Sequence, residues 1–321
     1  MRLRLPIVVF LVAAILGQSC TAPCPCGLIV DPITRPTSIA RPTDLILLTR
    51  APLFEAVALN MHPSWSPDGR ELVLERVPFH EGDPGLCVVR TDGTHPTMLG
   101  PTGRMMDPGW SPRNGWIAYW VSYKRSLMLL NREGQDNRLV TENGAVPSWS
   151  PDGERLVYER YQAQGNHDIC VIDWQGTGFQ TLLAGPADDI DPAWSPDGHR
   201  IAFSSDRDGV YNIYVMNADG SNITQITHAT TGDPRRGMIQ PTWSPDGIQI
   251  AFVCTSDTPS WLEGKLYVVN AAGGEPALLL DAEWCYDPAW SPDGTWLAFS
   301  YGGLNPSGPL GSDIYLLRMK R

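Results

Sequence analysis

The sequence repeats one short motif, Pro-x-Trp-Ser-Pro, six times along its 321 residues. The intervals between successive copies are 45, 39, 45, 49 and 47 residues. A period of this size indicates an array of supersecondary units, none of which can bury its apolar face alone. Because a catalytic centre is needed only once, six copies predict a structural role for the motif. Its tryptophans are Trp65, Trp110, Trp149, Trp194, Trp243 and Trp290.

The fourth unit, residues 191–227, predicts four strands. "PAWS" begins the first strand, and Ser195–Gly198 forms a turn in which Gly198 adopts a positive φ. "RIAFSS", "YNIYVMN" and "ITQIT" have the residue types and alternation of the next three strands. Four antiparallel strands in a unit of 39 to 49 residues predict one blade of a β-propeller.

The second copy of the motif supports a structural role. Arg113 and Asn114 stand where the fourth copy has Asp197 and Gly198. Asparagine tolerates a positive φ better than most residues, so we expect Asn114 to replace the turn glycine. A functional carboxylate would not be exchanged for arginine. The motif therefore predicts two structural features: its Ser-Pro-Asp-Gly part forms a turn, and its tryptophan packs between neighbouring sheets.

The last repeat contains only three predicted strands. The segment "DLILLT", residues 44–49, resembles the fourth strands of other units and precedes the first repeat. We expect it to supply the outer strand of the final blade. The sequence thus predicts an all-β fold over residues 44–321: a six-bladed β-propeller with four antiparallel strands per blade, its ring closed by an N-terminal strand.

The N-terminal segment has the pattern of an export signal. A basic start precedes an apolar run over residues 6–16, which is too short to span a bilayer. Residues 1–19 predict a signal peptide of the lipoprotein type, with Cys20 as the lipidated residue, and ordinary cleavage nearby is the alternative. Residues 20–43 predict a Pro-rich linker. The protein is expected outside the cytoplasm, as a membrane-anchored lipoprotein or as a periplasmic or secreted protein.

The net charge limits the kinds of binding partner, and the positions of the cysteines limit the possible disulfide bonds. A net charge of −11 argues against binding to nucleic acid, and we expect a monomer that touches the membrane only through a lipid anchor. Cys87 and Cys170 occupy the same repeat position two units apart, too distant to bridge, and are read as core residues. Cys254 with Cys285 stays open as the single candidate disulfide.

The repeated strings resemble a known family. Trp-Ser-Pro-Asp-Gly, followed by Ile-Ala-Phe and Ile-Tyr-Val-Met-Asn, is similar to the TolB-like, WD40-like (PD40) propeller repeats of bacterial envelope proteins, over about residues 44–321. The resemblance implies an extracytoplasmic scaffold without catalysis or cofactor of its own, binding an envelope protein or peptide, or a glycan. TolB itself has an α/β domain before its propeller, whereas only the signal and the linker precede the repeats here.

Binding is expected where the repeats vary. The loops between the second and third strands, and those between blades, differ in length on one face, including the loop that holds Trp261. The residue before each Pro-x-Trp is predicted to start the innermost strand at the channel mouth. Three acids there predict a Ca²⁺ site or a site for a cationic group, and the alternative is that Asp-Pro merely starts a turn. The six residues that precede Pro-x-Trp are His62, Asp107, Val146, Asp191, Gln240 and Asp287.

Enzymatic function is the alternative to a scaffold. The sequence has no Gly-x-Ser-x-Gly elbow, and its six histidines have no His-x-x-x-His spacing. A glycan-active propeller enzyme, a lyase or hydrolase with a site at the channel mouth, remains open, because its residues would be scattered along the chain.

Overall fold

The computed structural model describes residues 44–49, 58–78, 82–229, 237–255, 264–282, 284–303 and 311–319. The predictions for the signal, Cys20, the linker and Trp261 lie outside these residues. Strands joined by turns make up the described fold. None of its segments is a helix with the length and apolarity that a membrane span requires.

The repeats fold as units of four antiparallel strands that pair in chain order. The first unit contains β2 (Ala58–Trp65), β3 (Glu71–Pro78), β4 (Gly85–Arg90) and β5 (Thr97–Leu99). The second contains β6 (Met105–Trp110), β7 (Trp116–Val121), β8 (Ser126–Asn131) and β9 (Asn137–Glu142). The third contains β10 (Gly144–Trp149), β11 (Arg155–Tyr161), β12 (His167–Asp173) and β13 (Gln180–Leu183).

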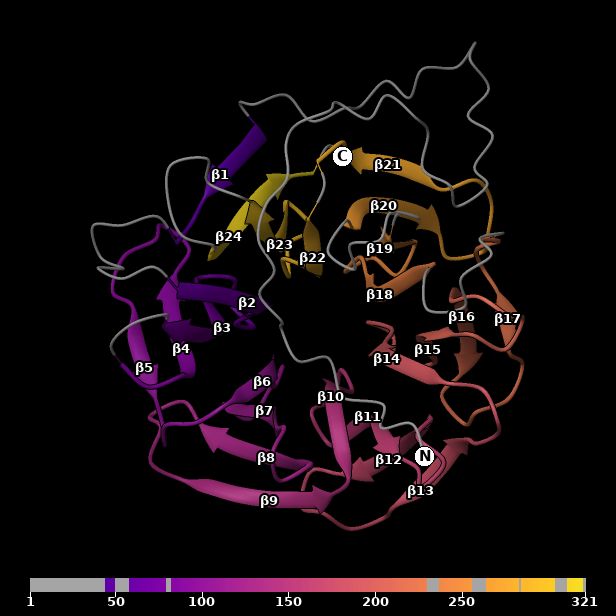
Figure 1. The fold of residues 1–321 in the computed structure, drawn as a ribbon, viewed down its shortest axis with the longest axis horizontal. Helices are drawn as coiled ribbons and strands as arrows, with labels where there is room; N and C mark the ends of the chain where they lie inside the picture. The colour runs from indigo at the N-terminus through magenta and orange to yellow at the C-terminus, as the bar shows by residue number, and fades with distance from the viewer. Residues whose placement is uncertain are drawn as a thin grey trace.

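The later units follow the same plan. The fourth contains β14 (Asp189–Trp194), β15 (Arg200–Ser205), β16 (Asn212–Asn217) and β17 (Thr224–Gln225). The fifth contains β18 (Met238–Trp243), β19 (Gln249–Thr255), β20 (Gly264–Asn270) and β21 (Ala277–Leu280), and the last contains β22 (Cys285–Trp290), β23 (Trp296–Gly303) and β24 (Gly311–Arg318). The units follow one another around a common centre, and the first strand of each lies nearest to it (Figure 1). The fold is all-β and propeller-like.

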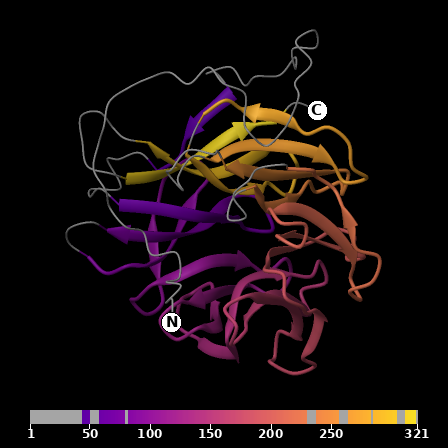
Figure 2. The same ribbon diagram turned by 45° about the vertical axis from the view of Figure 1, so that its right-hand side comes forward.

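The N-terminal strand β1 (Leu45–Leu47) pairs antiparallel with β24, as the sequence predicts, with Leu45 opposite Leu317. Figures 1 and 2 show β1 beside β24, where the two ends of the described chain meet. The contact continues past the strand, because Leu48 N donates to Ile314 O at 2.9 Å. A single parallel partner pair, Leu59 with Ser312, also joins β2 to β24.

The motif tryptophans pack between neighbouring units, as predicted. Trp65 lies in one apolar cluster with Leu72 of its own unit and Ile314 of the last unit. Its indole Nε1 also donates to Ala289 O, across the same boundary, at 2.9 Å. The indole of Trp65 therefore contributes both apolar area and one hydrogen bond to this junction.

The serine and aspartate side chains of the Ser-Pro-Asp-Gly motif form hydrogen bonds within their own turns. Ser66 Oγ donates to Asp68 Oδ1 at 2.7 Å, and Arg70 N donates to the same oxygen at 3.1 Å. These two hydrogen bonds hold the pKa of Asp68 below its usual value. The hydroxyl and the carboxylate of the motif close the turn, which is why they recur without forming a reactive site.

The turn of the second unit differs from the prediction. Gly115 has the positive φ, 73°, and Asn114 is not among the residues with positive φ. Asn114 Oδ1 instead accepts a hydrogen bond from Trp116 N at 3.3 Å, the role that Asp197 plays for His199 N. Asn114 thus takes the place of the turn aspartate, and Gly115 takes the place of the turn glycine. Both lie one residue later than in the other copies of the motif.

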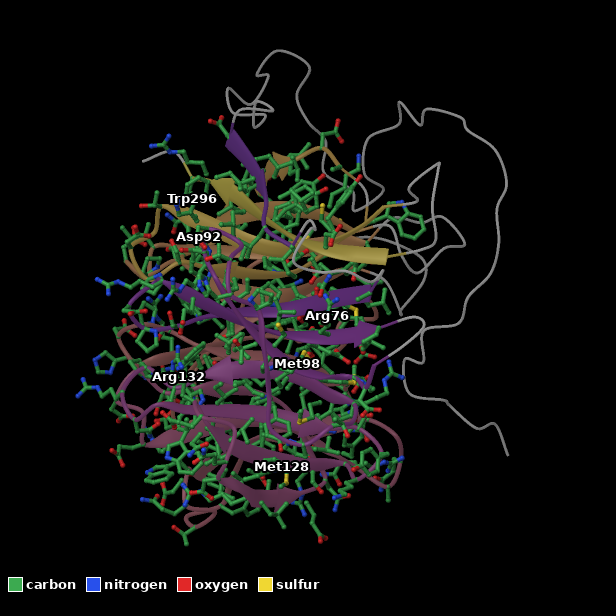
Figure 3. The ribbon with its side chains drawn as sticks, turned by 90° about the vertical axis from the view of Figure 1, so that its left-hand side faces the viewer. Arg76, Asp92, Met98, Met128, Arg132 and Trp296 are labelled. Carbon is green, nitrogen blue, oxygen red and sulfur yellow. The ribbon has the colours of Figure 1, made fainter. Side chains whose placement is uncertain are left out.

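Two faces of the propeller can be distinguished. We call the side with the Ser-Pro-Asp-Gly turns and the turns between third and fourth strands the turn face, and the opposite side the loop face. The two kinds of turn lie together, because Thr91 N donates to Arg70 O at 3.0 Å. Figure 3 shows Asp92 and Trp296 toward the turn face and Arg76 toward the loop face.

The described cysteines behave mostly as core residues. Cys87 and Cys170 are free and buried, as expected. Cys285 is also a free, buried thiol, so the candidate disulfide between Cys254 and Cys285 does not form. Cys285 Sγ donates to Ala282 O, three residues earlier in the chain, at 3.3 Å.

The junction between the first and last units gives a stability prediction. Leu48 is 3% exposed in the cluster that contains Trp65 and Ile314, whereas Ile46 on the same segment is 44% exposed. We expect Leu48→Ala to lower the free energy of unfolding by about 2–5 kcal/mol. The control Ile46→Ala should change it by only about 0.5 kcal/mol. Urea unfolding measures both, and equal losses would contradict this role of Leu48.

Candidate functional site

Six equivalent residues line the centre of the fold, and we call them the axial ring. Each has a positive φ, between 44° and 57°, although none is glycine. Each also lies at a break in the pairing of its strand with the next one, as between Met61 and Ser64. The axial ring consists of His62, Asp107, Val146, Asp191, Gln240 and Asp287.

These residues do not start the innermost strands, and this corrects the sequence prediction. The strand of the fourth unit begins at Asp189, so Asp191 lies inside it at a β-bulge. A bulge inserts an unpaired residue and re-aims its side chain. In every unit the ring residue is half-buried and the proline that follows it is buried. The bulge thus anchors the proline and turns the ring residue toward the axis.

His62 joins the first unit to both of its neighbours. Its Nε2 lies 3.0 Å from Asp107 Oδ1 and 3.6 Å from Asp287 Oδ1. Its backbone N donates to Asp287 Oδ2 at 3.2 Å. Side chains from the second and last units therefore converge on one imidazole.

Gln240 forms a second connection in the ring. Its Nε2 donates to Asp287 Oδ1 at 2.6 Å, and Asp287 N donates back to Gln240 Oε1 at 3.0 Å. Its own backbone N donates to Asp191 Oδ2 at 3.1 Å. The backbone N–H groups that the bulges free at His62, Gln240 and Asp287 are thus satisfied by a side chain of the preceding unit.

The second strands add two carboxylates that the sequence reasoning missed. Glu75, fully buried, places Oε2 3.2 Å from His62 Nδ1. Glu159 accepts a hydrogen bond from Asp191 N at 2.6 Å. Both stand where other units have Ser204 or Ser300. The signal was present in the strings "LVLER" and "LVYER", which put an acid at an otherwise small or neutral strand position.

Burial raises the pKa values of three carboxyl groups at the centre, those of Asp107, Asp191 and Glu159. Burial raises the pKa of Asp107 to about 6, with His62 opposing the shift and Asp287 adding to it. Burial also raises the pKa of Asp191 and of Glu159, and the charge of Asp107 raises both further. Desolvation lowers the affinity of His62 for a proton, but the charges of Asp107 and Asp287 and a hydrogen bond to Glu75 outweigh it. The pKa of His62 therefore lies well above its usual value.

A second polar cluster lies beside the ring on the loop face. His167 Nδ1 lies 2.6 Å from Asp188 Oδ1, and Tyr211 donates its hydroxyl to Asp188 Oδ2 at 2.7 Å. The imidazole of His167 also contacts the ring of Tyr161 edge-on, with centroids 4.6 Å apart. This cluster joins the third and fourth units and orients one imidazole.

No group of three or more His, Cys, Asp or Glu side chains is arranged to hold a metal ion within the described ranges. Ca²⁺ binding at Asp107, Asp191 and Asp287 stays a prediction. Each of these acids contacts neighbouring protein groups, as His62 and Gln240 show. The contribution of Trp261 also stays a prediction.

Comparisons with known proteins identify the family. The model of the TolB beta propeller domain matches residues 83–258, more than half of the chain. The chain belongs to the TolB β-propeller domain family. A curated relative, the protein TolB homolog of Chlorobium luteolum, is 31% identical over 126 residues, which make up 38% of this chain. The match spans only 28% of that relative's length.

Solved structures share the fold over most of the described chain. A putative TolB from Agrobacterium tumefaciens is 26% identical, with a TM-score of 0.63, covering 82% of this chain and 91% of that one. An oligogalacturonate lyase from Vibrio parahaemolyticus is 13% identical, with a TM-score of 0.57, covering 88% and 96%. The second likeness extends to the fold alone.

The shifted pKa values predict that stability falls as pH rises. The pKa values of Asp107, Asp191 and Glu159 are raised above their unfolded values near 4, so the folded state binds more protons. Their contribution is full below about pH 4 and is lost as pH rises through 6 and above, and His62 acts with the same sign. The turn aspartates, such as Asp68, act only below about pH 4, with the opposite sign.

Thermal unfolding measures this dependence. Between pH 5 and pH 8 we expect Tm to fall by about 5 °C or more. Asp191→Asn should flatten the slope, because the substituted group no longer titrates. A Tm that stays constant or rises over this interval would contradict the assignment of the carboxylates.

Proposed function

We propose that the protein is a non-catalytic binding scaffold outside the cytoplasm, which presents the axial ring to a protein or peptide ligand at the cell envelope. One observation carries the proposal: half-buried polar residues from successive units converge at the axis and are held by polar contacts between units. Polar groups fixed before binding lose little conformational freedom on binding, and this favours recognition.

We infer that the repeats close into a six-bladed ring. Four separate four-stranded sheets and one eight-stranded sheet, the latter divisible into two halves of four, give six comparable units. The hydrogen bond from Trp65 to Ala289 and the pairing of β1 with β24 support closure between the first and last units. A closed ring has only short sheet edges, which protects it from association through exposed strands.

The loop face is the better candidate for the working surface. On the turn face, Ser195 Oγ and His199 N both donate to Asp197 Oδ1, so that carboxylate is occupied within its own turn. The second-to-third strand loops and the connections between units vary on the loop face. A rigid scaffold with variable loops is the usual arrangement for a binding protein.

A glycan-active enzyme is the second candidate, and the cluster around His167 is the observation that favours it. Asp188 fixes the imidazole through Nδ1, an arrangement that suits general acid–base chemistry. The propeller of an oligogalacturonate lyase has a similar fold. Release of new chain ends from oligogalacturonate, lost in His167→Ala, would favour this candidate over the scaffold.

The scaffold is tested by capture of envelope partners with matched variants. We expect the triple variant Asp107→Asn, Asp191→Asn and Asp287→Asn to lose at least tenfold in the amount of partner captured, because the polar centre of the surface is altered. Trp261→Ala should weaken capture, and Asp152→Asn, on the turn face, should leave it unchanged. If Asp152→Asn lost capture and the triple variant kept it, the binding surface would lie on the turn face, and this would contradict the proposal.

We also propose that Cys20 is lipidated and becomes the first residue of the mature protein, given the export pattern of residues 1–19. Intact mass should show an acylated chain that begins at Cys20, and globomycin should cause the unprocessed precursor to accumulate. A mature chain without acyl mass, or with another first residue, would overturn the lipid anchor. Neither result bears on the binding surface.

A further inference from the structure

A cavity of about 450 Å³ lies on the axis of the fold. Its wall begins one residue after the axial ring, at Pro108 and Pro147, and ends at prolines of the Ser-Pro turns, such as Pro112 and Pro151. The cavity therefore lies on the turn-face side of the axial ring. Its volume is within the range of ligand pockets in proteins, which is roughly 300–1,000 Å³.

The wall of this cavity is uncharged, in contrast to the axial ring. No charged side chain is among the described residues that line it. Its polar side chains are hydroxyls and indoles, and the prolines and small residues of the repeat supply apolar surface. Because a charged ligand would lose water there without gaining a partner of opposite charge, the wall favours a neutral one. We call it the tryptophan cavity, after Trp110, Trp149, Trp194 and Trp243 in its wall.

The indole N–H groups around the axis fall into two sets. In one set the N–H donates to a carbonyl of the preceding unit, as Trp149 Nε1 does to Gly109 O at 2.9 Å. Trp243 Nε1 donates to Ala193 O in the same way, at 3.1 Å. Both acceptor residues line the tryptophan cavity. The edge of the indole that carries Nε1 therefore lies at the cavity wall in these units.

Trp194 belongs to the other set. It lines the cavity at the same position of the repeat and is only 6% exposed, but its Nε1 is buried without an acceptor among the described residues. The residue that corresponds to Gly109 is here Ser148, whose hydroxyl accepts the backbone N–H of Trp194 at 3.2 Å. A buried donor without a partner destabilises the fold. The indole of Trp194 thus points to a ligand with an acceptor atom.

Two hydroxyls add donors to the same wall. Ser64 Oγ accepts the backbone N–H of Trp110 at 3.0 Å, and Ser148 Oγ plays the same role for Trp194. Since each oxygen serves as an acceptor here, its own proton is available to a ligand. Both serines line the cavity. The side chains of the wall therefore offer donors and apolar surface, which suits a ligand that carries acceptors without donors.

Proline-rich peptide segments have this chemistry. A proline residue has a backbone carbonyl but no N–H, so a run of prolines presents acceptors alone. Such a run forms a polyproline II helix, in which no carbonyl is used by an internal hydrogen bond. Known domains bind these helices in grooves lined by aromatic side chains. A sugar fits the wall less well, because each of its hydroxyls brings a donor that needs an acceptor.

We propose that the tryptophan cavity binds a proline-rich segment of a partner protein, with a prolyl carbonyl accepting the indole N–H of Trp194. The pyrrolidine rings of the ligand contact the prolines and indoles of the wall. This inference goes beyond the proposed function, because the cavity and the loop face lie on opposite sides of the axial ring. The propeller then has a second binding site with a different chemistry.

Two tryptophan variants of the full chain separate binding from stability. Trp194→Phe removes an N–H without a partner, whereas Trp65→Phe removes the same atoms from an indole that donates to Ala289 O and lies outside the cavity wall. The probe is octaproline, acetylated and amidated at its ends, and calorimetry measures its affinity. We expect Trp194→Phe to weaken binding at least tenfold and Trp65→Phe to leave the affinity within twofold of wild type.

Thermal unfolding of the same variants gives the opposite order. Trp65→Phe should melt about 2 °C or more below Trp194→Phe, because only Trp65 loses a hydrogen bond. Wild-type affinity in Trp194→Phe, or an equal loss of affinity in both variants, would overturn the proposal. Failure of octaproline to bind the wild type would also overturn it.

Other probes distinguish other occupants. A Gly-Ser octapeptide, whose backbone carries N–H donors, should not bind, and equal affinity for it would overturn the preference for proline. Tighter binding of maltohexaose, lost in Trp194→Phe, would assign the cavity to a glycan. Octaproline binding that emerges only after the prolines of residues 20–43 are replaced by alanine would assign it to the linker of this chain.

The two binding sites are tested independently. The triple variant Asp107→Asn, Asp191→Asn and Asp287→Asn should bind octaproline as the wild type does. Loss of octaproline binding in Trp194→Phe, with capture of envelope partners intact, is the result that the proposal predicts. Loss of that capture in Trp194→Phe, without loss of octaproline binding, would contradict it.

Discussion

The left-handed backbone residue before each Pro-x-Trp proline is the constraint on which the rest of the structure depends. At six positions a non-glycine residue has a φ between 44° and 57°, at a cost of roughly 1–2 kcal/mol each. The bulge directs the side chain and the N–H of that residue to the axis. Hydrogen bonds between units, such as Asp287 N to Gln240 Oε1, offset the cost. The feature that strains each innermost strand therefore also assembles the polar centre.

The six units are alike in backbone but alternate in chemistry. Where the residue between proline and tryptophan is Gly109, Ala193 or Ala289, its carbonyl accepts the indole N–H of the next unit. Where it is Ser64 or Ser148, its hydroxyl accepts the backbone N–H of the next tryptophan instead. The acids of the axial ring follow the same alternation. The units differ in two sets of positions: the intervening ring residues His62, Val146 and Gln240, and the second-strand position that holds a glutamate in two units and a serine in others.

The repeat carried most of the fold prediction, because a turn motif and alternating strands depend on local chemistry. The pairing of β1 with β24 was predictable for the same reason, since an unpartnered strand at one end matched a missing strand at the other. Glu75 and Glu159 were missed because a glutamate in a strand is normally taken to face solvent. Their burial depends on contacts with His62 and Asp191 from elsewhere in the chain. The positive φ of Val146 could not be inferred from its type, since β-branched residues rarely adopt it.

The titration of His62 tests the central claim most directly, because its imidazole lies where the first, second and last units meet. Its pKa can be followed by the NMR shifts of the ring nitrogens as pH is varied. We predict a value well above 6.5 in the wild type, because the carboxylates of Asp107 and Asp287 outweigh desolvation, and a lower value in Asp287→Asn. A His62 that titrates near or below 6.5, with no response to Asp287→Asn, would contradict the convergence of these units at the axis.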